Sequence, residues 1–260
     1  MKNVQKVPES VLSRLLSYSK AHRIDYNSLL IRYIAERFLY RLGTSSYRDF
    51  FILKGAYLLS IRFDGQQYRT TKDIDFLKVG DSSTEALRKS LVDIVSIEEK
   101  LDGVVFDPDT MKIDPIREHK VYQGHRVKIS SYIGKARLVL QIDIGIGDSI
   151  SPAPVSYEIP SLLDLPDPTI TSYPLESVVA EKLEAIFSIG MLNSRMKDFY
   201  DLYFISCKES FSSASLMEAV RCTFARRGTP FPENFPPVLS PTVIEDTVKQ
   251  RQWEKKKKKI

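Results

Sequence analysis

The chain has 260 residues, of which 43% are hydrophobic and 27% are charged. This is ordinary globular composition, and the length suits one large domain or two small ones that fold without disulfides or structural metal ions. The sequence has no apolar run of the roughly 18 residues that a transmembrane helix needs, no apolar N-terminal segment typical of a secretory signal, and no cysteine spacing typical of a metal site. We therefore expect a reduced cytoplasmic protein without a membrane segment.

The net charge of +5 is concentrated in the last twelve residues. Residues 249–260 carry seven basic residues and one acid, whereas the rest of the chain has 31 basic and 32 acidic residues. Such a run is more often a solvated terminus than a docking site, although it adds non-specific attraction to a polyanion. We therefore treat residues 249–260 as a basic tail.

The hydrophobic periodicity predicts strands and helices in the first part of the chain and only helices in the last part. Amphipathic helices are predicted over about residues 10–22 and 27–42, followed by an apolar block, a strand at 73–79 and a helix at 84–95. Residues 104–147 are strand-rich, and a proline-rich connector with a short strand at 155–159 follows. The remaining predicted elements are helices at about residues 175–189, 194–207, 213–227 and 241–255.

These elements predict the fold class and the domain organisation. We expect an α+β fold in which an α/β domain with two N-terminal helices and a mixed sheet precedes a helical C-terminal domain. The expected boundaries are residues 1–152 for the α/β domain, 153–173 for a connector, 174–248 for the helical domain and 249–260 for the basic tail.

Two acidic residues on one predicted strand are the first sign of a functional site. Side chains alternate along a strand, so Asp73 and Asp75 share one face while Ile74 and Phe76 share the other. Two carboxylates on one face repel each other and are tolerated if they are exposed to solvent or if a cation lies between them. The motif alone leaves both interpretations open.

A third carboxylate follows on a later predicted strand. Leu138, Leu140, Ile142 and Ile144 form an apolar face, so Asp143 points to the other side. If this strand lies beside the Asp73 strand, three carboxylates meet on one side of a sheet, which suits a hard cation such as Mg²⁺. The alternative is that Asp143 simply faces solvent.

Lys182 interrupts the apolar side of a predicted helix. It lies within a stripe formed by Leu175, Val178, Val179, Leu183 and Ile186. A lysine there must extend to the surface, pair with a carboxylate or meet an anion. Asp198 and Asp201 lie on the next helix, which is apolar nearly all round, and also need partners. The residues therefore support either an anion-binding lysine or a structural buried ion pair.

Gly55 lies where an apolar strand meets a predicted helix, and a glycine there lets backbone N–H groups approach a phosphate. One glycine is a weak signal. The sequence contains no P-loop, dinucleotide-binding fingerprint or kinase motif. His22, His119 and His125 have no acid or nucleophile at a recognisable spacing.

The order of several motifs resembles that of one known family. The segments LKGA, RTTKDIDF, QIDIGIGD, YPLESVVAEKLEAI and SRMKDFYDLY follow one another between about Phe50 and Ile205. This series resembles the AbiEii-type toxin nucleotidyltransferases, which are abortive-infection and toxin–antitoxin proteins of the DNA polymerase β-like nucleotidyltransferase superfamily. The resemblance implies that the predicted α/β domain is a nucleotidyltransferase domain, with the active cleft between it and the helical domain.

The resemblance also assigns roles to individual residues. The implied metal ligands are Asp73, Asp75 and Asp143. Lys182 matches the motif lysine expected to hold the nucleotide phosphates, and Asp198 matches the acid expected near it. Together with the three metal ligands, these two residues form the implied catalytic set. The implied nucleotide-binding residues are Lys54, Gly55, Arg69, Thr71, Lys182 and Arg195.

The implied activity is that of a Mg²⁺-dependent nucleotidyltransferase of the EC 2.7.7 type. It would transfer NMP from an NTP to an acceptor hydroxyl, by analogy with toxin relatives the 3′ end of tRNA, and so block translation and growth. A cognate antitoxin is an expected partner. One alternative is a catalytically weak module that binds nucleotides or nucleic acid, and another is a nucleotidyltransferase that modifies a protein or a small molecule.

Overall fold

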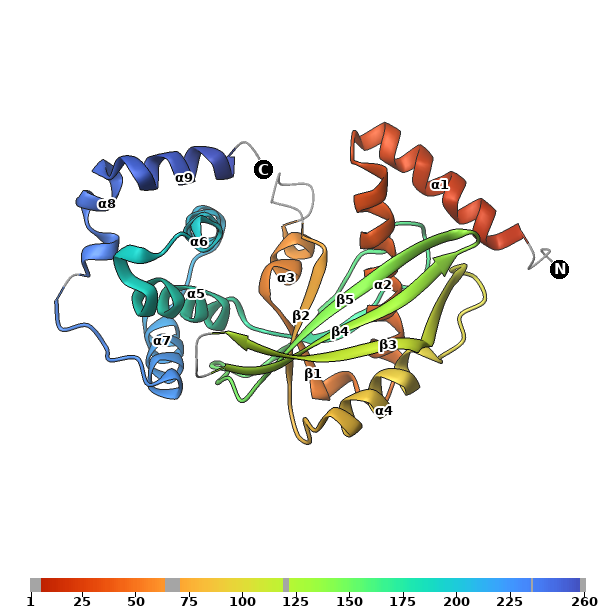
Figure 1. Cartoon of the computed structure of the whole chain (residues 1–260), viewed down its shortest axis with the longest axis horizontal. Helices are drawn as coiled ribbons and strands as arrows, with labels where there is room; N and C mark the ends of the chain where they lie inside the picture. Colours follow the sequence, from red (N-terminus) through yellow and green to blue (C-terminus); the bar gives the residue numbers. More distant parts are fainter. Residues whose placement is uncertain (1–5, 64–70, 119–121, 235, 258–260) are drawn as a thin grey trace. The chain divides into compact units, whose positions relative to one another are not determined.

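The computed structural model describes residues 6–63, 71–118, 122–234 and 236–257. The chain divides into two compact units. The first consists mainly of residues up to Ser172, and the second mainly of residues from Tyr173 onward. Strands occupy the first unit and helices dominate the second (Figure 1). The predicted α+β fold class is therefore confirmed.

A seven-stranded mixed sheet, in the order β3-β4-β5-β2-β1-β7-β6, forms the framework of the first unit. The pairs β3–β4, β4–β5 and β1–β2 are antiparallel, whereas β2–β5 and β1–β7 are parallel. The strands are β1 (Phe51–Lys54), β2 (Asp73–Lys78), β3 (Val104–Glu118), β4 (Tyr122–Ile133), β5 (Ala136–Ile146), β6 (Val155–Glu158) and β7 (Thr169–Ser172).

Helices cover the apolar face of this sheet. In β2, Ile74 and Phe76 are fully buried, and the ring of Phe76 lies 6.3 Å from that of Phe38 on α2. Phe106 of β3 packs on Phe38 as well, with ring centroids 6.2 Å apart. Asp73 and Asp75, which alternate with these residues, lie on the opposite face. The helices of this unit are α1 (Val7–His22), α2 (Tyr26–Thr44), α3 (Gly55–Arg62) and α4 (Thr84–Val95).

Local sequence signals explain where α2 and α4 begin. The Asp25 carboxylate accepts a hydrogen bond from the Ser28 N–H at 2.8 Å, and this contact caps the first turn of α2. The Ser83 hydroxyl accepts from the Ala86 N–H at 3.3 Å and caps α4 in the same way. Both helices therefore begin at residues whose side chains satisfy free backbone donors.

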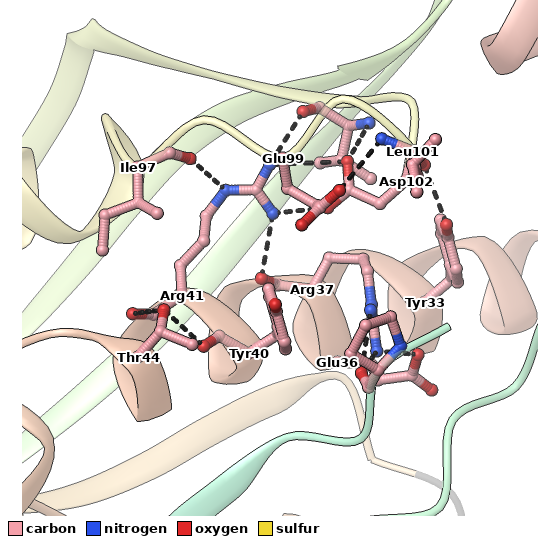
Figure 2. Close-up of polar contacts among 12 residues, drawn as sticks. Tyr33, Glu36, Arg37, Tyr40, Arg41, Thr44, Ile97, Glu99, Leu101 and Asp102 are labelled. Carbon is pink, nitrogen blue, oxygen red and sulfur yellow. Dashed lines mark hydrogen bonds and ion pairs between the residues drawn. The ribbon is translucent and has the colours of Figure 1, made fainter. Parts of the chain in front are cut away.

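A buried ion pair joins α2 to the segment between α4 and β3 (Figure 2). The Arg41 guanidinium donates to Asp102 at 2.6 Å, and its Nε donates to the Ile97 carbonyl at 3.0 Å. The Tyr33 hydroxyl donates to the Asp102 carbonyl at 2.8 Å. Both charged side chains are almost completely buried. Because each charge has lost its water, each depends on the other for compensation.

A second polar cluster joins α2 to the segment before β7. The Arg37 guanidinium contacts Glu36 at 2.6 Å and donates to the Pro166 carbonyl at 3.3 Å. Glu36 in turn accepts from the Leu162 N–H at 3.0 Å and from the Ser161 hydroxyl, also at 3.0 Å. Burial raises the pKa of the Glu36 carboxyl, against the lowering effect of Arg37. The α2 helix therefore fixes two irregular segments that border the sheet.

The second unit is helical. Its helices are α5 (Leu175–Ile189), α6 (Met196–Lys208), α7 (Ser213–Arg227), α8 (Pro241–Glu245) and α9 (Thr247–Lys257). Ala180 on α5 packs against Ala219, Val220 and Phe224 on α7, and the rings of Phe187 and Phe224 lie 5.4 Å apart. Among the described helices of the chain, none is long and apolar enough to cross a membrane.

The C-terminal segment is more ordered than its charge suggests. The helix predicted over residues 241–255 is divided into α8 and α9 at Asp246. Lys249, the first residue of the expected basic tail, is buried, and its Nζ donates to the Asn193 carbonyl. The ring of Trp253 lies 6.3 Å from that of Tyr200 on α6. Part of the segment expected to be a solvated tail is therefore a packed helix.

The Arg41–Asp102 pair generates the first prediction. We expect Asp102→Asn to lower the free energy of unfolding by about 3–5 kcal/mol, because it leaves the Arg41 charge buried without compensation. The control is Asp164→Asn, which removes the fully exposed partner of Arg14 and is expected to leave stability unchanged. Chemical denaturation of both variants measures the difference, and equal stabilities would contradict the role of the buried pair.

Candidate functional site

The strands β2 and β5 are neighbours, as the three-carboxylate hypothesis requires. They pair in parallel, with Asp75 opposite Asp143 and Asp73 opposite Gln141. On the other side of the same strands, Ile74 and Ile142 are fully buried. Since residues directly opposite each other in a sheet point to the same side, the three carboxylates predicted from the sequence share one face.

Strand pairing places five charged residues in one line across this face. In the order β1, β2, β5, β4 and β3, they are Lys54, Asp75, Asp143, Arg126 and Asp114. We call this line the charged row. Its two central carboxylates are flanked by a lysine on one side and an arginine on the other. The flanking cations reduce the repulsion that two adjacent carboxylates would otherwise produce.

Asp143 and Arg126 form a bidentate ion pair within the charged row. The Nε of Arg126 donates to Asp143 Oδ1 at 2.8 Å, and Nη2 donates to Oδ2 at 2.6 Å. The side chains keep 20% and 39% of their exposure, for Asp143 and Arg126 respectively. Both oxygens of Asp143 are therefore engaged, yet the pair lies close enough to solvent for another cation to compete with it.

Arg126 was not identified from the sequence, although a signal for it exists. A two-residue turn at Gly134 and Lys135 separates Ile133 from Ala136, which face each other across the β4–β5 hairpin. Counting outward from this pair by equal steps brings Arg126 opposite Asp143. Recognising the hairpin would have been enough to place the arginine beside the carboxylate.

Gly55 lies against the carboxylate of Asp75. It connects β1 to α3 with a φ of 71°, a backbone conformation that side-chain-bearing residues rarely adopt. A Cβ atom at this position would lie 2.3 Å from Asp75 Oδ2. The absence of a side chain therefore lets the backbone at the start of α3 approach the acidic group directly.

The donor set agrees in kind with a hard divalent cation. Asp73, Asp75 and Asp143 supply carboxylate oxygens, which Mg²⁺ prefers, and the Gly55 backbone leaves space beside Asp75. In the described ranges, no group of three or more acidic, histidine or cysteine side chains is already arranged to hold a metal ion. Asp143 is directed to Arg126 instead, so a cation that used Asp143 would compete with the guanidinium.

The structure also locates the neighbouring residues that the sequence selected. Thr71 is half-buried two residues before β2, whereas Arg69 lies outside the described residues. Lys54 is half-buried and stands opposite Asp75 at the end of β1. The nucleotide-binding roles expected for these three residues remain predictions.

In the second unit, Lys182 is surrounded by carboxylates. Its Nζ lies 2.5 Å from Asp201 Oδ2 and 3.3 Å from Asp198 Oδ1. Arg195 Nε donates to the other oxygen of Asp198 at 2.7 Å. Lys182, Asp198 and Asp201 are all buried. This network joins Asp201 to Lys182, Arg195 and Asp198, the three residues predicted for the site in this unit. The arrangement is the buried ion pair that the sequence analysis gave as the alternative to an anion-binding lysine.

The first unit has the arrangement that the sequence resemblance implies for a nucleotidyltransferase domain. Its mixed sheet carries a carboxylate pair beside a third carboxylate. A strand–glycine–helix junction comes before that pair in the sequence. A family comparison agrees: residues 37–260 match the model described as nucleotidyl transferase AbiEii toxin, type IV toxin–antitoxin system. The chain belongs to this family. The resemblance read from the motifs is therefore confirmed.

Comparison with curated proteins finds no match. Among solved structures, the chain is similar to JHP933 from Helicobacter pylori, with 15% sequence identity, a TM-score of 0.47 and coverage of 90% of this chain and 95% of that chain. It is also similar to an antigenic nucleotidyltransferase-like protein from Paracoccidioides brasiliensis, with 11% identity, a TM-score of 0.41 and coverage of 75% and 89%.

The Gly55 contact generates a second prediction. We expect Gly55→Ala to lower the free energy of unfolding by about 1–2 kcal/mol from backbone strain alone, and by more because Asp75 must move. Gly80→Ala is the matched control, since Gly80 has a φ of 81° but its added Cβ would lie no closer than 3.7 Å to another atom. Equal losses in chemical denaturation would show that the Gly55–Asp75 approach has no energetic consequence.

The Lys182 network generates a third prediction. Lys182→Met retains the apolar part of the side chain and removes the charge that compensates Asp198 and Asp201. We expect it to lower the free energy of unfolding by about 3–5 kcal/mol. Lys197→Met, at an exposed position on α6, is the control and is expected to leave stability unchanged. A Lys182→Met protein as stable as the control would contradict the role of this ion-pair network in the fold.

Proposed function

We propose that this protein transfers NMP from an NTP to an acceptor hydroxyl at the 3′ end of tRNA, and that this modification blocks translation and growth. The acceptor oxygen would form a bond to the α-phosphorus of the NTP, and pyrophosphate would leave. Membership of a nucleotidyltransferase toxin family supports the reaction class. The observation that carries the proposal is the strand register that sets Asp75 opposite Asp143. The backbone of Gly55, which has no side chain, lies directly against the Asp75 carboxylate. The choice of tRNA as acceptor follows the analogy with toxin relatives.

The carboxylates of the first unit would hold Mg²⁺. When bound, this ion would neutralise charge on the phosphates and lower the pKa of the acceptor hydroxyl. Asp73 and Asp75 would be its ligands, together with Asp143. Asp143 would also accept the proton of the hydroxyl, in competition with its ion pair to Arg126. Arg126 would therefore hold Asp143 on the correct face until the substrates are present.

The remaining residues of the first unit would bind the nucleotide. The Gly55 backbone would approach the phosphates, and Lys54 would supply a positive charge beside them. Arg69 and Thr71, which precede the Asp73 strand in the sequence, would complete the nucleotide contacts.

In the second unit, Lys182 would bind the triphosphate and Arg195 would assist it. A phosphate oxygen would compete with Asp198 and Asp201 for the same ammonium group. The carboxylates would then have a positioning role, because they hold Lys182 extended while no nucleotide is bound. Charge stabilisation by the lysine, rather than covalent chemistry, would be its contribution to the reaction.

A toxin of a type IV toxin–antitoxin family implies a cognate antitoxin as partner. We propose that the antitoxin prevents growth arrest by this protein. The cytoplasm is the proposed location, because NTPs and tRNA are both present there.

The fourth prediction tests the transfer reaction. Purified protein incubated with each labelled NTP, Mg²⁺ and total RNA is expected to label RNA. Asp75→Asn is expected to reduce the labelling rate by about 100-fold or more, because the amide loses the negative charge that a metal ligand needs. Asp164→Asn changes the net charge equally at a fully exposed position and is expected to retain the wild-type rate.

Growth provides an independent readout of the same change. Expression of the wild-type protein is expected to arrest bacterial growth, and Asp75→Asn is expected to relieve the arrest. Labelling by Asp75→Asn at the wild-type rate would eliminate the metal-site interpretation. Absence of both labelling and growth arrest with the wild-type protein would favour the non-catalytic binding module.

A further inference from the structure

The face that bears the charged row extends over three long strands, β5, β4 and β3, which run side by side (Figure 1). A second line of residues crosses these strands beside the charged row. It runs from Asp73 through Gln141 and Lys128 to Lys112, each opposite the next in register. The inter-strand spacing puts Lys128 about 10 Å from Asp73.

Lys112 and Lys128 form a pair of like charges without an ion-pair partner among the residues that the structure describes. They are directly opposite each other on adjacent strands, and both are exposed. Within the described residues, neither lysine side chain takes part in an ion pair or a hydrogen bond. Like charges directly opposite each other destabilise a sheet. An anion held between the two ammonium groups would remove that repulsion, so the pair favours a negatively charged ligand.

Further along the same face, the cation Arg137 lies among aromatic and apolar residues. Tyr132 is opposite Arg137 on β5 and Val105 on β3, and Val139 is opposite Ser130. Val105 and Val139 are 63% and 50% exposed, although both belong to regular strands. Asp107, opposite Ser130, is the acidic residue among them. The other face of these strands is buried in the core, with Val127, Ile129 and Ile133 fully buried, so the surface has a rigid support.

We propose that this surface binds the single-stranded acceptor end of an RNA. We define it as the strand platform, which consists of Val105, Lys112, Lys128, Tyr132, Arg137 and Val139. The cations would contact phosphates, while Tyr132 and the two exposed valines would contact bases. A positively charged groove or face with exposed rings and apolar groups is typical of single-strand binding.

The inference rests on the proposed transfer reaction, because Lys128 of the platform lies only two strands from Asp73 in register. An RNA strand lying along it would bring its terminal hydroxyl toward the charged row. The platform would thereby select the acceptor class, while the charged row would carry out the reaction.

The test compares two double variants with the same change in net charge. Lys112→Glu/Lys128→Glu alters the platform, and Lys89→Glu/Lys100→Glu alters two exposed lysines outside it. Binding of tRNA to the full chain is followed by fluorescence anisotropy at several salt concentrations, and transfer kinetics give KM for RNA and for NTP. Melting temperatures confirm that both variants fold.

We expect the platform variant to bind tRNA at least about tenfold more weakly and to reduce the slope of log affinity against log salt by about 1.4–1.8, as two lost phosphate contacts require. Its KM for NTP should equal that of the wild type. Tyr132→Leu should weaken binding without changing the salt slope, because stacking is lost and no phosphate contact changes.

The outcomes distinguish a failure of the platform assignment from a failure of the proposed transfer reaction. If the wild type transfers NMP to RNA and both double variants bind tRNA equally well, or equally poorly, the platform assignment is wrong while the proposed function stands. If tRNA binds in a platform-dependent manner but no RNA is labelled, the proposed function fails and the platform stands. Competition by poly-glutamate as effective as that by RNA would overturn the assignment to RNA.

Discussion

The parallel pairing of β2 with β5 is the constraint on which the candidate site depends. It sets Asp75 directly opposite Asp143, and two carboxylates at that spacing repel each other. The sheet accepts the pair because its neighbouring strands supply Lys54 and Arg126 in the same line. These two cations balance the two facing carboxylates, and the Arg126–Asp143 contact keeps part of its exposure to solvent. The protein can therefore fold with this site formed before any ligand binds.

The ion pairs of the two units differ in their exposure to solvent. The Arg126–Asp143 pair retains a substantial part of its exposure, whereas Lys182, Asp198 and Asp201 are almost fully buried. Separation of charges near solvent costs little because water replaces the lost partner, while separation of buried charges is strongly unfavourable. The helical unit therefore holds its lysine in one place, and the sheet unit presents carboxylates that remain available.

Much of the fold and part of the site could be predicted from the sequence, because they depend on local periodicity. Alternation along two strands placed Asp73, Asp75 and Asp143 on polar faces, and helical spacing placed Lys182 in an apolar stripe. Periodicity along one strand does not give the partners on neighbouring strands: Arg126 follows only once the β4–β5 hairpin is recognised, and Lys54 reaches Asp75 through the pairing of β1 with β2. The burial of Lys249 was missed because a run of lysines has no apolar pattern that would indicate packing.

The short turn at Gly134 and Lys135 has a consequence for how this chain can vary. Surface turns usually tolerate insertions, because few contacts depend on them. Here a single added residue absorbed into β4 or β5 would shift that strand by one position and exchange its two faces. Arg126 would no longer stand opposite Asp143, and the lysine-bearing side of β4 would turn into the core. Homologous chains should therefore keep the length of this hairpin constant even where its residues differ.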